Sequence, residues 1–197
     1  MALSKNLGFP ESSESSSGMS AIPPSFHSLE HDEPFRRCLT CEGELQAMDH
    51  PYTVTKVFKG PECVFEYAMC LPCRRKLAKS FSEESQKTMQ DFFEKNPHLP
   101  HRNERLTGQE DHQEWIRQCA TCATPIEELT DYSLACMGLG SEMVIDPFPM
   151  MVCSRCEEDI QGRLSKSTRE QWDKFILDNF DGPPADSLKP DGVPILV

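Results

Sequence analysis

The chain has 197 residues, of which 38% are hydrophobic, and its formal net charge is −12. This length accommodates one ordinary domain or two small ones. Two small units would bury too little apolar area to be stable alone, so they would need covalent or metal cross-links. The negative charge opposes binding to phosphate backbones, and we therefore expect no nucleic acid partner for the whole chain.

The first 33 residues are rich in Ser, Glu and Pro and include the run ESSESSSG. Such a composition cannot bury enough surface to offset the entropy lost on ordering. We therefore predict disorder over residues 1–33, and by the same reasoning a flexible tail over residues 182–197. The tail ends in PILV, an apolar sequence of the kind that carboxylate-binding grooves accept.

The sequence contains neither the apolar run of a secretory signal nor a stretch of about 18 apolar residues that could span a membrane. We therefore expect a cytoplasmic protein with no membrane partner. Disulfides do not persist in a reducing cytoplasm, so most of the ten cysteines are expected to act as metal thiolates.

A first structured unit is predicted over residues 34–97, and it begins with the cysteine pair CLTC at 38–41. The runs YTVTKVF (52–58) and CVFEYAMC (63–70) flank a Gly-Pro turn, so they predict a β-hairpin. From residue 70 onward apolar residues recur every three or four positions, which predicts a helix that ends at Asn96-Pro97. The serine-rich run SFSEES indicates a break within this helix.

A connector over residues 98–116 leads to a second unit over residues 117–181, which begins with CATC at 119–122. The runs DYSLACMGLG and EMVIDPFPMMVC predict a looser hairpin, whose prolines suit an edge strand. The helix that follows ends at DGPP. Ser167 and Glu170 have the spacing of a capping box, so this helix is expected to break and restart near residues 165–167.

The two units repeat one pattern. Ten Lys and Arg residues stand against nine Asp and Glu over residues 34–98, whereas six stand against eleven over 117–180. The surfaces therefore differ in charge, but the apolar positions of the helices agree. When CLPC (70–73) is aligned with CSRC (153–156), the coinciding pairs are Leu77 with Ile160, Phe81 with Leu164, Met89 with Trp172, Phe92 with Phe175, and Phe93 with Ile176.

Four close cysteine pairs are the strongest functional signal. A Cys-x-x-Cys turn places two thiolates about one zinc ligand edge apart, and two such turns complete a tetrahedral site. All four ligands then come from the protein and leave no open position, which indicates structural rather than catalytic zinc. Iron in the same geometry is the alternative metal. We predict two zinc ions per chain, one bound by Cys38, Cys41, Cys70 and Cys73 and the other by Cys119, Cys122, Cys153 and Cys156.

Each unit resembles a treble-clef zinc finger, in which a knuckle and a hairpin lead into a helix whose first turn provides two ligands. The resemblance rests on ligand spacing and element order over residues 38–96 and 119–180. It implies a small metal-stabilised α+β fold with two tandem zinc modules, each made of a knuckle, a β-hairpin and a C-terminal helix. This architecture serves many functions, so it implies no particular activity.

Two further groups of residues have alternative interpretations. Cys63 and Cys136 lie in predicted strands, where they are either small half-buried side chains or a redox-sensing pair. Basic residues around the first cysteine pairs either balance the negative charge of four zinc-bound thiolates or form an anion or nucleic-acid patch. The residues of this basic patch are Arg36, Arg37, Arg74, Arg75, Lys76 and Lys79.

The six histidines lie in the predicted tails and connectors and are expected to be solvated, and no catalytic motif occurs. We therefore predict a protein that is not an enzyme and binds a protein partner as an interaction or adaptor module. The apolar run PFPMM (147–151) is a candidate anchor. The alternatives are a nucleic-acid-associated zinc protein that uses the basic helix of the first unit, and a thiol-based redox or metal sensor.

Overall fold

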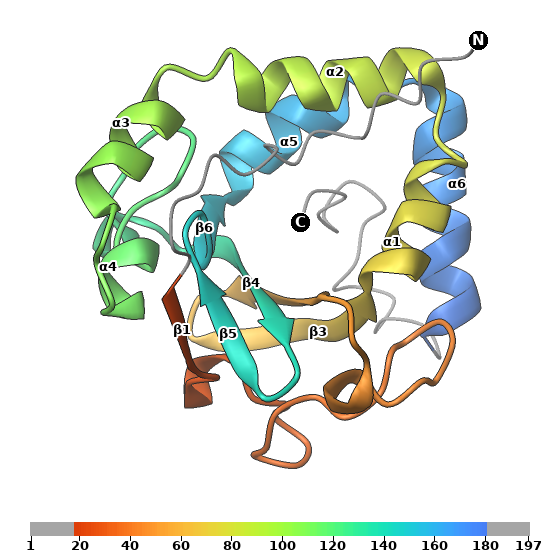
Figure 1. Cartoon of the computed structure of the whole chain (residues 1–197). Helices are drawn as coiled ribbons and strands as arrows, with labels where there is room; N and C mark the ends of the chain where they lie inside the picture. The colour runs from red at the N-terminus through yellow and green to blue at the C-terminus, as the bar shows by residue number, and fades with distance from the viewer. Residues whose placement is uncertain (1–17, 181–197) are drawn as a thin grey trace, which may run out of the picture.

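The computed structural model describes residues 18–180. The predictions for residues 1–17, for the flexible tail and for its PILV end lie outside this range. The protein is α+β, with an antiparallel sheet of six strands in the order β1-β5-β4-β2-β3, and β6 also pairs with β4 (Figure 1). The strands are β1 (Gly18–Ala21), β2 (Tyr52–Lys59), β3 (Glu62–Cys70), β4 (Asp131–Leu139), β5 (Glu142–Ile145) and β6 (Met150–Cys153).

Both predicted hairpins are present. β2 and β3 pair along their whole length around a turn that contains Gly60, whose φ of 57° suits glycine. In the second hairpin β4 pairs first with β5 and then with β6. Pro147 and Pro149 lie in the break between those two strands. The sequence predicted an edge strand here, but β5 also pairs with β1, so that prediction is wrong for β5.

The two hairpins form one continuous sheet, which the sequence analysis did not anticipate. β2 pairs with β4 from Tyr52 opposite Gly138 to Lys59 opposite Asp131. β2 is therefore central and buried over residues 52–57, which explains why its sequence is apolar or β-branched at most positions. The two cysteine-containing units therefore share one hydrophobic core and are not separate domains.

Both predicted helix breaks are present. Ser82 caps α2 by accepting a hydrogen bond from the amide of Ser85, and Ser165 caps α6 through the amide of Thr168. The capping residue of α6 is thus Ser165, two residues before the predicted Ser167. The helices of the two units are α1 (Leu71–Ala78) and α2 (Glu83–Glu94) in the first and α5 (Ser154–Arg163) and α6 (Lys166–Asn179) in the second.

The two helix breaks also contact each other. The hydroxyl oxygens of Ser82 and Ser165 lie 2.8 Å apart. The amide of Ser82 donates to Thr168 Oγ1 at 3.0 Å, and the amide of Ser165 donates to Ser85 Oγ at 2.9 Å. These reciprocal bonds join equivalent positions of the repeat, so the units pack about an approximate two-fold axis both here and at the β2–β4 pairing.

Residues 18–33 are ordered in this fold, in contrast to the predicted disorder. β1 pairs with β5, and the 3-10 turn η1 (Pro24–Phe26) packs against β2. Ile22 and Phe26 are buried, and Lys56 of β2 donates to the carbonyl of His27. Residues 1–33 are polar on average, so their composition does not reveal this short apolar segment. The segment is ordered because it packs against the sheet.

The predicted connector contains two helices, α3 (His98–Leu106) and α4 (His112–Ile116). Arg102 of α3 is 3% exposed and lies over the Trp115 ring, with its guanidinium carbon 4.9 Å from the ring centre. Its Nη2 donates to the carbonyls of Trp115 at 2.9 Å and Pro149 at 2.6 Å. These contacts attach the connector to the segment between β5 and β6. The unit boundaries predicted at 34–97 and 117–181 stay predictions.

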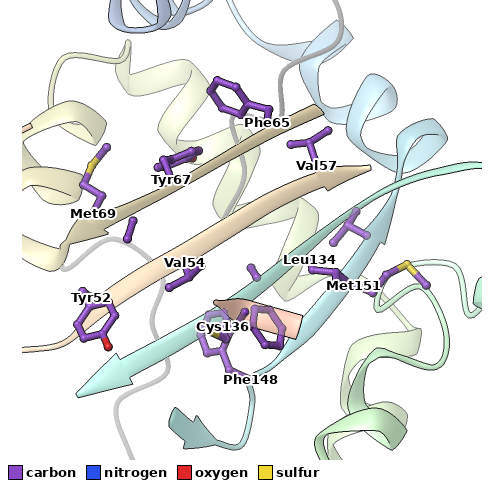
Figure 2. Close-up of a cluster of buried hydrophobic side chains, with 14 of the residues drawn as sticks. Tyr52, Val54, Val57, Phe65, Tyr67, Met69, Leu134, Cys136, Phe148 and Met151 are labelled. Carbon is purple, nitrogen blue, oxygen red and sulfur yellow. The ribbon is translucent and has the colours of Figure 1, made fainter. Parts of the chain in front are cut away.

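The core continues through both units, as Figure 2 shows for residues of β2, β3, β4 and β6. The apolar positions that coincide in the repeat lie in it or pack against it, with Phe81 and Ile160 buried. Phe148 and Met151 of the PFPMM run are also buried, so they belong to the core and are not a surface anchor. Across residues 18–180, every helix is too short or too polar to cross a membrane.

Candidate metal centres

The structure brings the eight predicted ligands together in two groups. In each group the four sulfur atoms lie within 4.8 Å of one another, although about thirty residues separate the two cysteine pairs along the chain. The first group is Cys38, Cys41, Cys70 and Cys73, and the second is Cys119, Cys122, Cys153 and Cys156.

Each group is built from a knuckle and the start of a helix. β3 ends at Cys70, which is also the N-cap of α1, and β6 ends at Cys153, the N-cap of α5. The fourth cysteine lies in the first helical turn, where free amides and the helix dipole favour a thiolate. The amide of Cys70 donates to Cys38 Sγ at 3.4 Å, and the second centre has the equivalent 3.4 Å bond from Cys153.

The knuckles have the same backbone geometry. The amide of Glu42 donates to the carbonyl of Cys38 at 2.9 Å, and Ala123 donates to Cys119 at 2.8 Å. Glu42 and Ala123 have φ angles of 57° and 59°, in the left-handed region that side chains other than glycine seldom adopt. The strain at both positions indicates that the fold requires this turn in order to aim two sulfurs at one point.

The sulfur positions fit a tetrahedral zinc ion. A Zn–S distance of about 2.3 Å implies ligand-to-ligand edges of about 3.8 Å. The Cys41 and Cys70 sulfurs are 3.9 Å apart, and the Cys122 and Cys153 sulfurs are 3.7 Å apart. Thiolate sulfur in a tetrahedral array is typical of zinc, or of iron in the same geometry. The donor set and its spacing therefore suit a metal that needs four protein ligands.

The electrostatics of the clusters favour a bound cation. A hydrogen bond from Cys156 lowers the pKa of Cys119 to about 4, even though burial opposes this. The same contact, together with burial, raises the pKa of Cys156. Burial also raises the pKa of Cys153 to about 11. The charge of one thiolate thus disfavours ionisation of the neighbouring thiols. A dication at the centre would stabilise all four thiolates, so its binding would release protons.

The two remaining cysteines lie apart from the clusters and from each other. Cys63 pairs with Phe58 on one side of β2, whereas Cys136 pairs with Val54 on the other side. A strand separates them and they are displaced along it, so their Cα atoms are too far apart for a disulfide. Cys136 is completely buried, and burial raises its pKa. The redox-pair interpretation is therefore wrong for this fold.

Half of the basic patch already makes contacts within the protein. Arg74 turns inward and donates to Thr53 Oγ1 at 3.4 Å, and burial lowers its pKa. Arg36 forms an ion pair with Glu33, and Arg37 donates to the carbonyl of Glu42 at 3.1 Å. Arg36 and Arg37 nevertheless stay exposed, and so do Arg75, Lys76 and Lys79 on and just after α1.

Basic residues of α3, which the sequence patterns did not mark as a site, lie beside the second centre. A cavity of about 180 Å³ between α3 and the second knuckle is lined by His98, His101, Arg102 and Arg105, and by Cys119. Burial and the nearby Arg105 lower the pKa of Arg102 to about 10. The four basic residues are spaced three and four positions apart, so they lie on one face of the helix. A helix predicted over the connector would therefore have grouped them.

Comparisons with protein-family models, with curated protein sequences and with solved structures find no match to this chain. The metal centres are therefore interpreted from their own geometry. Each of the two groups of four cysteines can hold a metal ion, and the four-thiolate donor set is of the kind that binds zinc.

Proposed function

We propose that this protein binds two structural zinc ions in treble-clef-type centres and acts without catalysis as a protein-interaction or adaptor module. The observation that carries the metal assignment is the convergence of four thiols at each centre, within 4.8 Å of one another. Four protein ligands complete a tetrahedral zinc shell, so neither substrate nor water has a coordination position to occupy.

The zinc ions would hold together parts of the chain that the shared sheet leaves at its margins. Each centre attaches a knuckle to the end of a strand and to the first turn of a helix. Structural zinc of this kind contributes on the order of 10 kcal/mol to folding. We propose that the metal thereby stabilises the fold, while the surfaces, which differ in charge between the units, are available for recognition.

A protein partner is favoured over nucleic acid by the arrangement of charge. Three of the six basic residues in the predicted patch are engaged by the protein itself, and the chain as a whole carries −12. Counterion release from phosphates needs several free cations on one surface, and long-range repulsion acts against it here. Protein recognition has no such requirement.

The test is a titration of the intact zinc-loaded protein against mixed duplex and single-stranded nucleic acid at about 150 mM salt. We expect weak binding that changes little when Arg75, Lys76 and Lys79 are replaced together by Ala. Sub-micromolar, steeply salt-dependent binding that this triple variant abolishes would instead establish the nucleic-acid alternative. Arg74 is left unchanged, because it also contacts Thr53 and its replacement would affect packing as well as charge.

The adaptor role requires a direct partner. We expect cross-linking in the native cell to capture a protein that then binds the purified chain in a defined ratio by calorimetry. Failure of every captured protein to bind the purified chain would count against this role, and it would leave the zinc assignment unaffected.

A further inference from the structure

The two centres share their backbone frame, so their side chains account for the differences between them. In both, the amide of the third cysteine donates to the sulfur of the first at 3.4 Å. The knuckle turn is also the same, with a left-handed residue directly after the second cysteine. The repeat therefore provides an internal comparison in which one site serves as the reference for the other.

The second centre has side-chain hydrogen bonds to its sulfur atoms. Thr121 Oγ1 lies 3.2 Å from Cys119 Sγ, and Thr124 Oγ1 lies 3.1 Å from Cys122 Sγ. Two hydroxyls thus stabilise negative charge on the two knuckle sulfurs.

The first centre lacks these donors within the part of the chain that the structure describes. Gly43 occupies the position of Thr124. Thr40 corresponds to Thr121, but it is exposed and its hydroxyl forms no hydrogen bond to sulfur. Cys41 is exposed, whereas its counterpart Cys122 is partly buried. The first centre is therefore both more accessible and less supported.

These differences act in the same direction on metal release. A hydrogen bond to a zinc-bound sulfur disperses its charge and reduces its readiness to take a proton, and proton uptake must accompany the loss of zinc. Exposure of a ligand residue also lets an external chelator approach the metal. We propose that the first centre is an exchangeable zinc site and that the second retains its zinc. This inference rests on the proposed function, in which both clusters hold zinc.

The experiment uses the full zinc-loaded chain, an excess of the chelator EDTA and timed pulses of a thiol-alkylating reagent. Mass spectrometry then reports which cysteines become modified. We expect Cys38, Cys41, Cys70 and Cys73 to be labelled at least tenfold faster than the other four ligands, because the loss of one sulfur hydrogen bond corresponds to about a tenfold change. Cys136 is fully buried, so it stays unmodified while the core is folded and serves as the folding control.

Variants distinguish the side-chain donors from other causes. Thr121→Val together with Thr124→Val removes both hydroxyl donors to the knuckle sulfurs and is expected to speed labelling of the second centre about tenfold or more. The matched control is Thr40→Val, which removes a hydroxyl that contacts no sulfur and should change neither centre. Thr124→Val alone gives a smaller change of the same sign and keeps the test available if the double variant does not fold.

Equal labelling rates at the two centres, or faster labelling of the second, would overturn the proposal. An unchanged rate at the second centre in the folded double variant would do the same. If the proposed zinc binding itself is wrong, the labelling pattern will differ from both of these results. A folded chain that carries no zinc would expose all eight ligand cysteines to the reagent at once, before any chelator is added.

Discussion

The ion pair between buried Lys56 of β2 and partly buried Glu66 of β3 leads to a quantitative prediction about the N-terminal segment. Lys56 is 2% exposed, and its Nζ lies 3.0 Å from Glu66 Oε2. Glu66 Oε1 accepts hydrogen bonds from the amide of Leu29 at 2.8 Å and from Ser28 Oγ at 3.2 Å. Glu66→Gln keeps the shape and an acceptor for the segment, but it leaves the ammonium group of Lys56 buried without a counter-charge.

Removing one partner of a buried ion pair typically costs about 3–5 kcal/mol, a large part of the 5–15 kcal/mol that stabilises a domain. We expect a loss in this range for Glu66→Gln in urea unfolding with zinc in excess. The double variant Lys56→Met/Glu66→Gln removes both charges and should recover to within about 1–2 kcal/mol of the parent. The exposed pair of Lys95 and Asp91 is the control, and Asp91→Asn should cost less than about 1 kcal/mol.

The reasoning would be refuted by a Glu66→Gln variant that loses no more than the Asp91→Asn control. It would equally be refuted if the double variant were as unstable as the sum of Lys56→Met and Glu66→Gln, because additivity would mean that the two charges do not act as a pair.

Four other substitutions test the shared sheet, the helix caps and a buried carboxyl group. Gly138→Ala should destabilise the protein by about 1–3 kcal/mol in urea unfolding, because the added Cβ would lie 2.4 Å from Tyr52 Cζ. A neutral effect would contradict the β2–β4 register. Ser82→Ala and Ser165→Ala should each cost about 1 kcal/mol, and the double variant less than their sum because the hydroxyls contact each other; strict additivity would argue against that contact. Burial raises the pKa of Glu157 from 4.5 to about 8, so the folded state holds this proton to higher pH than the unfolded chain and stability falls as pH rises through that window. Glu157→Gln should therefore gain stability relative to the parent between about pH 5 and pH 8 at fixed zinc, and parallel pH profiles would contradict this assignment.

Local signals in the sequence predicted much of the fold. The Cys-x-x-Cys spacing identified all eight residues that converge, because a knuckle fixes the positions of two sulfurs over four residues. The β-branched run at 52–58 became β2, and the serine-rich interruptions became the caps at Ser82 and Ser165. In each case the determining interactions lie within a few residues of one another.

The remaining features depend on distant contacts that no local pattern encodes. The pairing of Thr55 with Ala135 joins strands from different units, and nothing in either strand specifies the other as its neighbour. Arg74 appears in the sequence as one of a run of surface cations, yet the facing β2 places Thr53 where its guanidinium can turn inward. Phe26 is a single aromatic residue in a polar stretch, and only the sheet beneath it makes it part of the core.

The joined sheet also changes what loss of one metal should do. Each unit contributes strands to the same core, and reciprocal bonds link Ser82 and Ser165. We therefore expect Cys153→Ser to lower the stability of the whole protein in one cooperative transition, instead of disordering the second unit alone. Two separated transitions by circular dichroism would indicate independent units.

Native mass spectrometry and elemental analysis of the purified chain would show whether each cluster of four cysteines holds one zinc ion. We expect two zinc ions per chain in a colourless preparation, one zinc ion in Cys38→Ser and in Cys119→Ser, and two in Cys63→Ser, whose thiol lies outside both clusters. A folded parent chain without metal, a coloured preparation containing iron, or a Cys63→Ser variant with fewer zinc ions would contradict the account.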